Sequence, residues 1–332
     1  MAGLLILAGD VGGTKSYLGL FQSTGNGFTS VAEHRYSSAD FAGPAELLAA
    51  FVAHTGRRPD RVVLGVPGSV RHLPVKPVNL PWCIDPDQVR THLGVAEVHL
   101  LNDLQATAYG TLALRAEDLS VLNPGQVDRE GNIAVIAAGT GLGEGGLCWA
   151  GHRYVSIASE GGHTDFSPST DLEAELWRYL FDRYGHVSWE RVVSGPGLVH
   201  LYDFLRETGR GEEPDWLRRE LEQGDRAGVI AQAAMEGSCP LAAQAFDLFV
   251  SLYGAEAGNL ALKLLATGGV YVAGGIAPKI AGKLQEGRFM KAFRAKGRMA
   301  DTVGTMPVRI VLNDRAGLLG AAHWGAQLDQ GV

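Results

Sequence analysis

The chain opens on a strand, a glycine turn and a second strand: residues 4–21 read LLILAGDVGGTKSYLGLF. The apolar run before Gly9-Asp10 predicts a buried strand, and apolar, β-prone residues return at Tyr17–Phe21. Residues 9–16 nearly spell a Walker phosphate loop, but such a loop must open a helix. Because a strand follows here, we reject that interpretation. The pattern favours a hairpin turn whose successive backbone N–H groups can face an anion.

The same arrangement recurs twice along the chain. The buried run Ile133–Ala138 leads into AGTGLG at residues 138–143, and Val270–Ala273 leads into AGGIAP at residues 273–278. Glycine in such turns permits a positive φ and close approach of a ligand, and the hydroxyls of Thr14 and Thr140 suit phosphate oxygens. One such turn is most simply a tight turn, whereas three at strand ends indicate a phosphate site. For Lys15, a solvated turn residue and a phosphate contact remain equally open.

The remaining pattern alternates between strands and helices. We expect further strands at residues 29–36, 62–66, 98–101, 145–149, 154–157 and 308–312. We expect helices at residues 45–54, 86–93, 104–114, 171–184, 198–208, 216–222, 227–235, 241–265 and 315–327. The long helix 241–265 carries the small residues Ala255, Ala257, Gly258 and Ala261. They permit close packing in the core and also leave a dimer interface open.

Composition excludes several classes of protein. The chain has 332 residues, of which 45 are Gly, and a formal net charge of -7, with its basic residues dispersed. A basic stripe for nucleic acid is therefore not indicated. The three cysteines lie far apart, which argues against a disulfide framework and a structural zinc site. Asp10 comes too early for a signal peptide, and no apolar run approaches the ~20 residues of a membrane span. We expect a cytoplasmic protein of about two domains, with no membrane partner.

Six motifs give the chain a recognisable pattern. They are GDVGGT at 9–14, LNDLQA at 101–106, AGTGLG at 138–143, SEGGHTDF at 159–166, GHVSWERVVSGPGL at 185–198 and VAGGI at 272–276. Their order and spacing resemble the actin/hexokinase/Hsp70 ATPase superfamily and, more specifically, the bacterial glucokinase family, over nearly the whole chain. Lys15 departs from the Asn usual in that family, and the zinc-binding His and Cys of many ROK sugar kinases are absent.

The resemblance implies a fold and a reaction. The fold is α/β, a two-lobed actin-like ATPase (ribonuclease H-like) fold in which each lobe is a mixed sheet flanked by helices, with a cleft between them. Residues 1–113 plus 313–332 would form the small domain, and residues 114–312 the large one. The reaction is transfer of the γ-phosphoryl group of ATP to the 6-hydroxyl of glucose, the first step of glycolysis, with Mg²⁺ as cofactor. The family also often forms homodimers.

The three turns supply the expected nucleotide site. The residues assigned to the phosphates and the adenosine side are Asp10, Gly12, Gly13, Thr14, Gly139, Thr140, Gly141, Gly274 and Gly275. Asp10, at a strand end, is the expected Mg²⁺ ligand, directly or through water.

The resemblance also assigns the sugar site. Asn102 and Asp103 would face the 4- and 6-hydroxyls, and Glu160, His163 and Glu190 would face hydroxyls 1 to 3. Asp103 is the expected general base, because it follows a strand at the edge where open α/β sheets bind ligands. Simpler alternatives exist for each assignment. Asn102-Asp103 could cap a helix, Glu160 could be a solvated carboxylate, and Glu190 could begin an amphipathic helix. Asn79 could approach the sugar, although a turn is the simpler interpretation.

Two other functions are open to this fold. A sugar-sensing regulator would usually add a helix-turn-helix for DNA, for which the few residues before the first strand leave no room. An ATPase that drives partner binding would turn over ATP without sugar. The complete motif set favours the sugar kinase over both.

Overall fold

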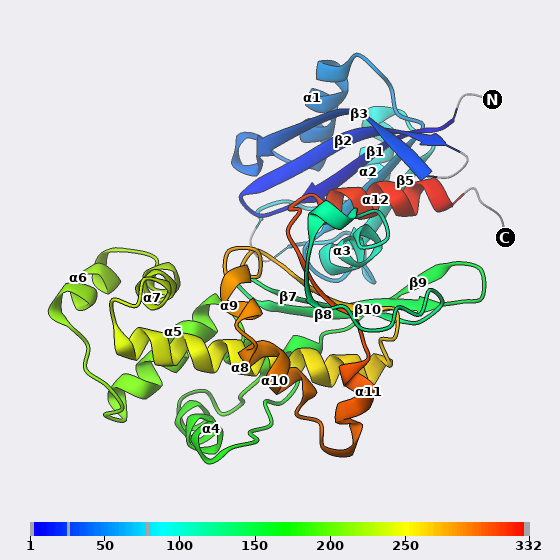
Figure 1. Cartoon of the computed structure of the whole chain (residues 1–332). Coiled ribbons are helices and arrows are strands. Elements are labelled where there is room, and N and C mark those ends of the chain that lie inside the picture. The colour runs from blue at the N-terminus through cyan, green and yellow to red at the C-terminus, as the bar shows by residue number, and fades with distance from the viewer. Residues whose placement is uncertain (1–2, 25–26, 78–79, 329–332) are drawn as a thin grey trace. The chain divides into compact units, whose positions relative to one another are not determined.

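The computed structural model describes residues 3–24, 27–77 and 80–328. The chain forms two compact units, Met1–Asp118 with Asn313–Val332 and Leu119–Leu312 (Figure 1). The crossing between them follows Asp118, whereas the sequence places it near Leu114. Asp118 stays with the first unit, where its carboxylate accepts a hydrogen bond of 2.8 Å from the side chain of Asn313.

The first unit is built on a five-stranded sheet in the order β3-β2-β1-β4-β5. Its strands are β1 (Leu5–Val11), β2 (Lys15–Thr24), β3 (Gly27–Ser37), β4 (Arg61–Val66) and β5 (Glu97–Asn102). β1, β2 and β3 form the expected antiparallel meander, and β4 and β5 continue the sheet in parallel with β1. Every residue of β4 is buried, as a strand covered on both faces must be.

The described residues of the first unit form four α-helices. They are α1 (Pro44–Thr55), α2 (Pro86–Leu93), α3 (Asp103–Gly110) and α12 (Ala316–Gln327). Glycine lets α12 approach α3 at backbone distance, since a Cβ at Gly320 would overlap the carbonyl oxygen of Ala106. α3 ends at Gly110, earlier than the expected Leu114. A Cβ at Gly110 would overlap the carbonyl of Ala316. The glycine-rich end of the chain is thus a packing surface.

The second unit repeats the layout on a six-stranded sheet, in the order β6-β11-β10-β7-β8-β9. Its strands are β6 (Leu119–Asn123), β7 (Ile133–Ala138), β8 (Leu142–Trp149), β9 (Tyr154–Ile157), β10 (Gly269–Ala273) and β11 (Val308–Val311). β7, β8 and β9 are antiparallel, and β10 and β11 run parallel to β7, as in the first unit. β6 was not expected. It forms one edge of the sheet by pairing antiparallel with β11, which is distant in sequence.

The longest helix of the second unit is α8 (Pro240–Leu264), and α5, α7, α10 and α11 pack against it. The other helices of the unit are α4 (Asp171–Tyr184), α5 (Gly195–Glu207), α6 (Asp215–Gln223), α7 (Arg226–Met235), α9 (Ala281–Gln285), α10 (Arg288–Arg294) and α11 (Ala300–Gly304). The small residues of α8 serve the core, because a Cβ at Gly254 or Gly258 would overlap backbone carbonyls of α10. Ala257 and Ala261 are buried as well. This stripe is therefore not a free face for a second copy of the chain.

No helix of residues 3–24, 27–77 and 80–328 has the length and apolar character needed to cross a membrane.

Candidate active site

The first glycine turn closes a hairpin. β1 ends at Val11 and β2 begins at Lys15, with the N–H of Gly12 donating to the carbonyl of Lys15 at 3.0 Å. The Ser38 hydroxyl supports the turn by donating to the carbonyl of Gly12 at 2.7 Å. Because a strand follows, the rejection of a Walker loop is confirmed. Thr14 is exposed at the tip, where its hydroxyl can face a ligand.

Asp10 is the residue before the buried Val11 at the end of β1 and lies in a negative field. Burial, and after it the nearby carboxylates of Asp103 and Asp314, raise the pKa of its carboxyl to about 6. Gly317, in α12, leaves room for this side chain, since a Cβ there would lie 2.9 Å from Asp10 Oδ2. A buried carboxyl that shares its field with other carboxylates is a natural partner for a cation.

Asn102 is the cap of α3, so the helix-cap alternative is confirmed. Its Oδ1 accepts from the N–H of Leu104 at 3.0 Å, and Gln105 accepts from the Asn102 N–H in return. Its Nδ2 donates to the carbonyl of Gly68 at 3.0 Å. These bonds hold Asp103, the first residue of α3, at the end of β5 with its side chain exposed. Asn102 therefore anchors Asp103, and a sugar contact by Asn102 stays a prediction.

The second glycine turn is bound to Glu190. Gly139 donates to the carbonyl of Gly141 at 2.8 Å, which closes the turn between β7 and β8. Glu190 Oε2 accepts from the N–H of Leu142 at 3.0 Å, and a Cβ at Gly141 would overlap that same oxygen. Nothing lies within 4 Å of a Cβ built on Gly139, so this side of the turn is open.

Glu190 does not begin an amphipathic helix. It lies in a single 3₁₀ turn, Trp189–Arg191, which the loop at residues 159–165 pins in place. We call residues 159–165, where the sequence predicts sugar contacts, the sugar loop. Its Thr164 carbonyl accepts from the N–H of Trp189 at 3.0 Å, and its Asp165 pairs with His186 at 2.9 Å.

The sugar loop contains the second short turn, Gly161–His163. The N–H of His163 donates to the carbonyl of Glu160 at 3.0 Å, and His163 Nδ1 lies 3.9 Å from Glu190 Oε1. The side chains of Glu160 and His163 are exposed. The structure thus brings His163 together with Glu190, on the backbone of the second glycine turn. Asn79 lies outside the described residues.

The third glycine turn differs from the other two in its backbone. Gly274 has φ of 83°, and a Cβ there would overlap the carbonyl of Ala138. The expectation of positive φ is wrong for Gly12, Gly13, Gly139 and Gly141, which do not adopt it. At Gly12 crowding favours glycine instead, because a Cβ would overlap the backbone carbonyl of Lys15, and at Gly141 a Cβ would displace the carboxylate of Glu190.

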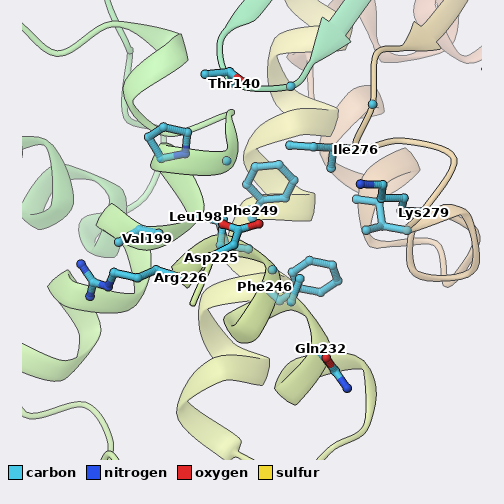
Figure 2. Close-up of a pocket in the computed structure, with 18 of the residues that line it drawn as sticks. Thr140, Leu198, Val199, Asp225, Arg226, Gln232, Phe246, Phe249, Ile276 and Lys279 are labelled. Carbon is cyan, nitrogen blue, oxygen red and sulfur yellow. The ribbon is translucent and has the colours of Figure 1, made fainter. Parts of the chain in front are cut away.

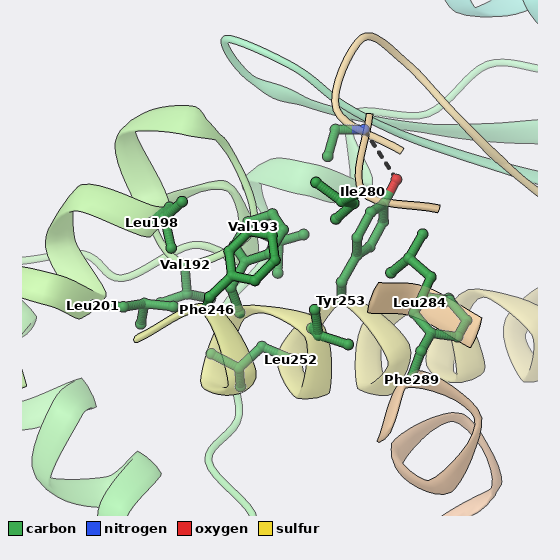
Figure 3. Close-up of a cluster of buried hydrophobic side chains, with 14 of the residues drawn as sticks. Val192, Val193, Leu198, Leu201, Phe246, Leu252, Tyr253, Ile280, Leu284 and Phe289 are labelled. Carbon is green, nitrogen blue, oxygen red and sulfur yellow. Dashed lines mark hydrogen bonds between the residues drawn. The ribbon is translucent and has the colours of Figure 1, made fainter. Parts of the chain in front are cut away.

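Tyr253 of α8 bonds to the residues that precede the second and third glycine turns. Its hydroxyl accepts from the N–H of Ala138 at 3.3 Å, the bond drawn in Figure 3, and donates to the carbonyl of Ala273 at 3.3 Å. Ala138 and Ala273 end β7 and β10, directly before Gly139 and Gly274. Tyr253 is fully buried on α8, so the core of the unit sets the spacing of both turns.

A pocket of about 840 Å³ opens beside these turns, within the second unit. Figure 2 shows Thr140 at one end of the view, Phe249 and Phe246 of α8 in the middle, and Gln232 at the other end. The apolar middle suits a flat ring, and the glycine turns suit phosphates. Of this lining, Gly139, Thr140 and Gly275 were expected from the sequence. The apolar wall was not expected, nor were the following polar rim residues: Asp225, Arg226, Gln232 and Lys279.

The missed residues carried a partial signal. Gly195-Pro196-Gly197 belonged to a recognised motif, and Gly195 and Pro196 line the pocket where α5 begins. Asp225 precedes α7 without capping it through its side chain. Phe246 and Phe249 read as ordinary core positions of a long apolar helix, and nothing in their local pattern marks a pocket.

Known proteins similar to this chain belong to one family. The family model described as Glucokinase matches residues 7–328. A glucokinase of Synechocystis sp. is 43% identical, over 98% of this chain and 99% of that protein. The crystal structure of a glucokinase from an Antarctic psychrotroph superposes with a TM-score of 0.87 at 31% identity, covering 98% of this chain and 99% of that one.

A more distant structure shares the fold. It is a ROK family glucokinase from Streptomyces griseus in complex with glucose and AMPPNP, with a TM-score of 0.62 at 23% identity, covering 96% of this chain and 98% of that one. The expected α/β fold of actin-like sugar kinases is confirmed, with two mixed sheets flanked by helices. The chain belongs to the glucokinase family.

Proposed function

We propose that this chain transfers the γ-phosphoryl group of ATP to the 6-hydroxyl of glucose, giving glucose 6-phosphate and ADP. Family membership supports the reaction. The observation that carries it is the bond between Glu190 and the N–H of Leu142. It joins a polar cluster suited to sugar hydroxyls to a glycine turn suited to phosphates. The complexes of related folds with glucose and with an ATP analogue are consistent with these two ligands.

In the proposed reaction Asp103 is the general base. Its carboxylate accepts the proton of the 6-hydroxyl as that oxygen attacks the γ-phosphorus and the bond to the β-phosphate oxygen breaks. The capping bonds of Asn102 hold Asp103 at the end of β5, so the base is placed by a rigid helix start. We propose that Asn102 and Asp103 bind the 4- and 6-hydroxyl end of the sugar.

We assign the other sugar hydroxyls to side chains of the second unit. We propose that Glu160, His163 and Glu190 bind hydroxyls 1 to 3, since carboxylate and imidazole groups pair well with groups that both donate and accept. His163 lies 3.9 Å from Glu190, close enough for one hydroxyl to contact both.

The nucleotide is assigned to the glycine turns and the pocket. We assign Gly12, Gly13 and Thr14, together with Gly139, Thr140 and Gly141, to the phosphate oxygens. We assign Gly274 and Gly275 to the adenosine side, and Gly275 lines the pocket with the apolar wall. Phosphoryl transfer depends on such positioning by N–H and hydroxyl donors.

We assign Mg²⁺ to Asp10. The described residues contain no cluster of three or more His, Cys, Asp or Glu that could hold a metal by itself. The raised pKa of Asp10, caused by burial and by Asp103 and Asp314, fits a group whose negative charge a bound cation compensates. Bound Mg²⁺ would neutralise charge that develops on the phosphates.

A matrix of sugars and phosphoryl donors, assayed on the purified protein, tests the proposal. We expect Mg²⁺- and ATP-dependent formation of glucose 6-phosphate. ATP hydrolysis that needs no sugar would favour the ATPase alternative, and sugar binding without turnover would favour a regulator. We also propose a cytoplasmic homodimer, to be tested by fractionation and by analytical ultracentrifugation.

A further inference from the structure

A pair of buried carboxyl groups lies behind the sugar loop and has no part in the reaction proposed above. Glu144 lies on β8, shortly after the second glycine turn, and is 1% exposed. Glu256 lies on α8 and is fully buried. Burial raises the pKa of both carboxyls, and the charge of Glu256 acts on Glu144. Two buried carboxyls in one field resist ionising together, so one of them carries a proton.

The surrounding donors show which one. Glu256 accepts from Asn259 Nδ2 at 2.7 Å with one oxygen and from the Lys263 ammonium at 3.1 Å with the other. No group in the described part of the chain hydrogen-bonds to the buried Oε1 of Glu144. Burial, and after it the negative charge of Glu256, raise the pKa of Glu144 to about 8. Burial also raises the pKa of Glu256, but Asn259 and Lys263 act against that rise, so the proton resides on Glu144.

The protonated carboxyl of Glu144 also forms the floor of the sugar loop. A Cβ at Gly161 would overlap Glu144 Oε2, so the loop backbone rests directly on this oxygen. The carbonyl of Gly161 in turn accepts from the N–H of Thr164 at 3.0 Å and from its hydroxyl at 2.7 Å. Gly161 lies between Glu160 and His163, and any displacement of it moves both side chains.

We propose that Glu144 is a positioning residue for sugar binding: its neutral carboxyl supports Gly161 and thereby fixes Glu160 and His163. The inference rests on the assignment of these two residues to glucose. When Glu144 loses its proton, two buried negative charges face each other, and separating them displaces the loop. The effect is a weaker affinity for glucose at alkaline pH, with ATP binding unchanged.

The other charged groups near Glu144 and Glu256 do not offset the repulsion that arises when Glu144 loses its proton. Lys263 already pairs with Glu256, and Lys296 donates to Asn259 Oδ1 at 2.7 Å and to the carbonyl of Ala255 at 2.8 Å. On the loop side, Glu160 and His163 are exposed, and Glu190 is bound to Leu142. Ionised Glu144 therefore meets no unused cation among these groups.

The test compares the chain with Glu144→Gln, which keeps a neutral donor of the same shape, and with Glu144→Ala, which removes it. The glucose KM and the ATP KM are measured between about pH 6 and about pH 9.5. For the unaltered chain we expect the glucose KM to rise at least about fivefold above pH 8, with a constant ATP KM. Glu144→Gln should keep the low glucose KM and lose the alkaline rise. Glu144→Ala should have a high glucose KM at every pH.

Glu173→Gln is the matched control. Glu173 is a buried carboxylate of the same unit that binds Ser169 and takes no part in the pair. It should leave the alkaline rise intact. The inference fails if Glu144→Gln shows the same alkaline rise as the unaltered chain, or if Glu144→Ala keeps a normal glucose KM.

Infrared difference spectroscopy supplies a readout that needs no turnover. A protonated-carboxyl band should be present at pH 7, lost above about pH 9 and absent from Glu144→Gln. Its absence at pH 7 would overturn the proton assignment. If the band is present but the chain phosphorylates no sugar, the proposed function fails while the proton assignment stands.

Discussion

The carboxylate of Glu190 accepts a hydrogen bond of 3.0 Å from the backbone N–H of Leu142, while its other oxygen lies 3.9 Å from His163. A side chain that we assign to the sugar thus also holds the turn that we assign to the phosphates. The first prediction follows from this double role.

Glu190→Ala should raise the KM for both glucose and ATP. It removes a sugar ligand and leaves the Leu142 N–H without its charged acceptor, and kcat/KM should fall by ~10²-fold or more. Glu160→Ala is the control, because Glu160 makes no side-chain cap bond and should raise the glucose KM alone. An unchanged ATP KM in Glu190→Ala would show that the turn does not depend on this bond. Steady-state kinetics with each substrate varied measures both.

Asp103→Asn should lower kcat by ~10²–10⁴-fold while glucose binding is partly kept, since the amide cannot accept the proton. Asn102→Ala makes the complementary change, because it removes the helix cap and keeps the Asp103 carboxylate. It should cost ~1 kcal/mol of stability and lower the Tm by a few degrees. Near-normal turnover by Asp103→Asn would remove Asp103 from its catalytic role.

Asp10→Asn should stabilise the protein and abolish activity. The folded-state pKa of about 6 lies above the ordinary value of 3.8 for an aspartate, so folding favours protonated Asp10. Stability therefore falls as pH rises from about 4 to about 6, and the cost is complete above pH 6. Replacing the carboxyl of Asp10 removes this cost, so the free energy of unfolding should rise by about 1–3 kcal/mol at pH 7.5 without Mg²⁺ or nucleotide. The gain should vanish near pH 4. Thermal unfolding across this range gives the answer, and a gain that does not depend on pH would contradict the assignment.

Tyr253→Phe should raise the ATP KM and leave the glucose KM unchanged. The substitution leaves the buried N–H of Ala138 without its acceptor, at a cost of ~1–3 kcal/mol, and frees the carbonyl of Ala273. Tyr202→Phe is the matched control, since Tyr202 is equally buried but bonds to Glu213. It should lower stability without changing the ATP KM. Equal effects of the two variants on ATP binding would mean that Tyr253 has no special link to the turns.

Much of the fold follows from local sequence. Strands such as β7 and helices such as α2 and α4 begin and end where their apolar pattern, caps and turn residues predict. The hairpin nature of the first turn followed from the strand that comes after Gly12-Gly13-Thr14. β6 and the short helices α9, α10 and α11 escaped prediction, because long-range pairing and packing stabilise them more than their own pattern does.

The sequence alone determined the glycine turns, their places at strand ends and the residue types offered to sugar and phosphate, because turn and strand patterns are local. Tertiary structure alone decided what lies against Gly141 and Gly161, since carboxylates of Glu190 and Glu144 occupy the space where Cβ atoms would lie. It also decided that Glu144 meets Glu256 and that Phe249 lines a pocket. These contacts join residues far apart along the chain, so no local pattern records them, and only close packing of the folded unit brings them together.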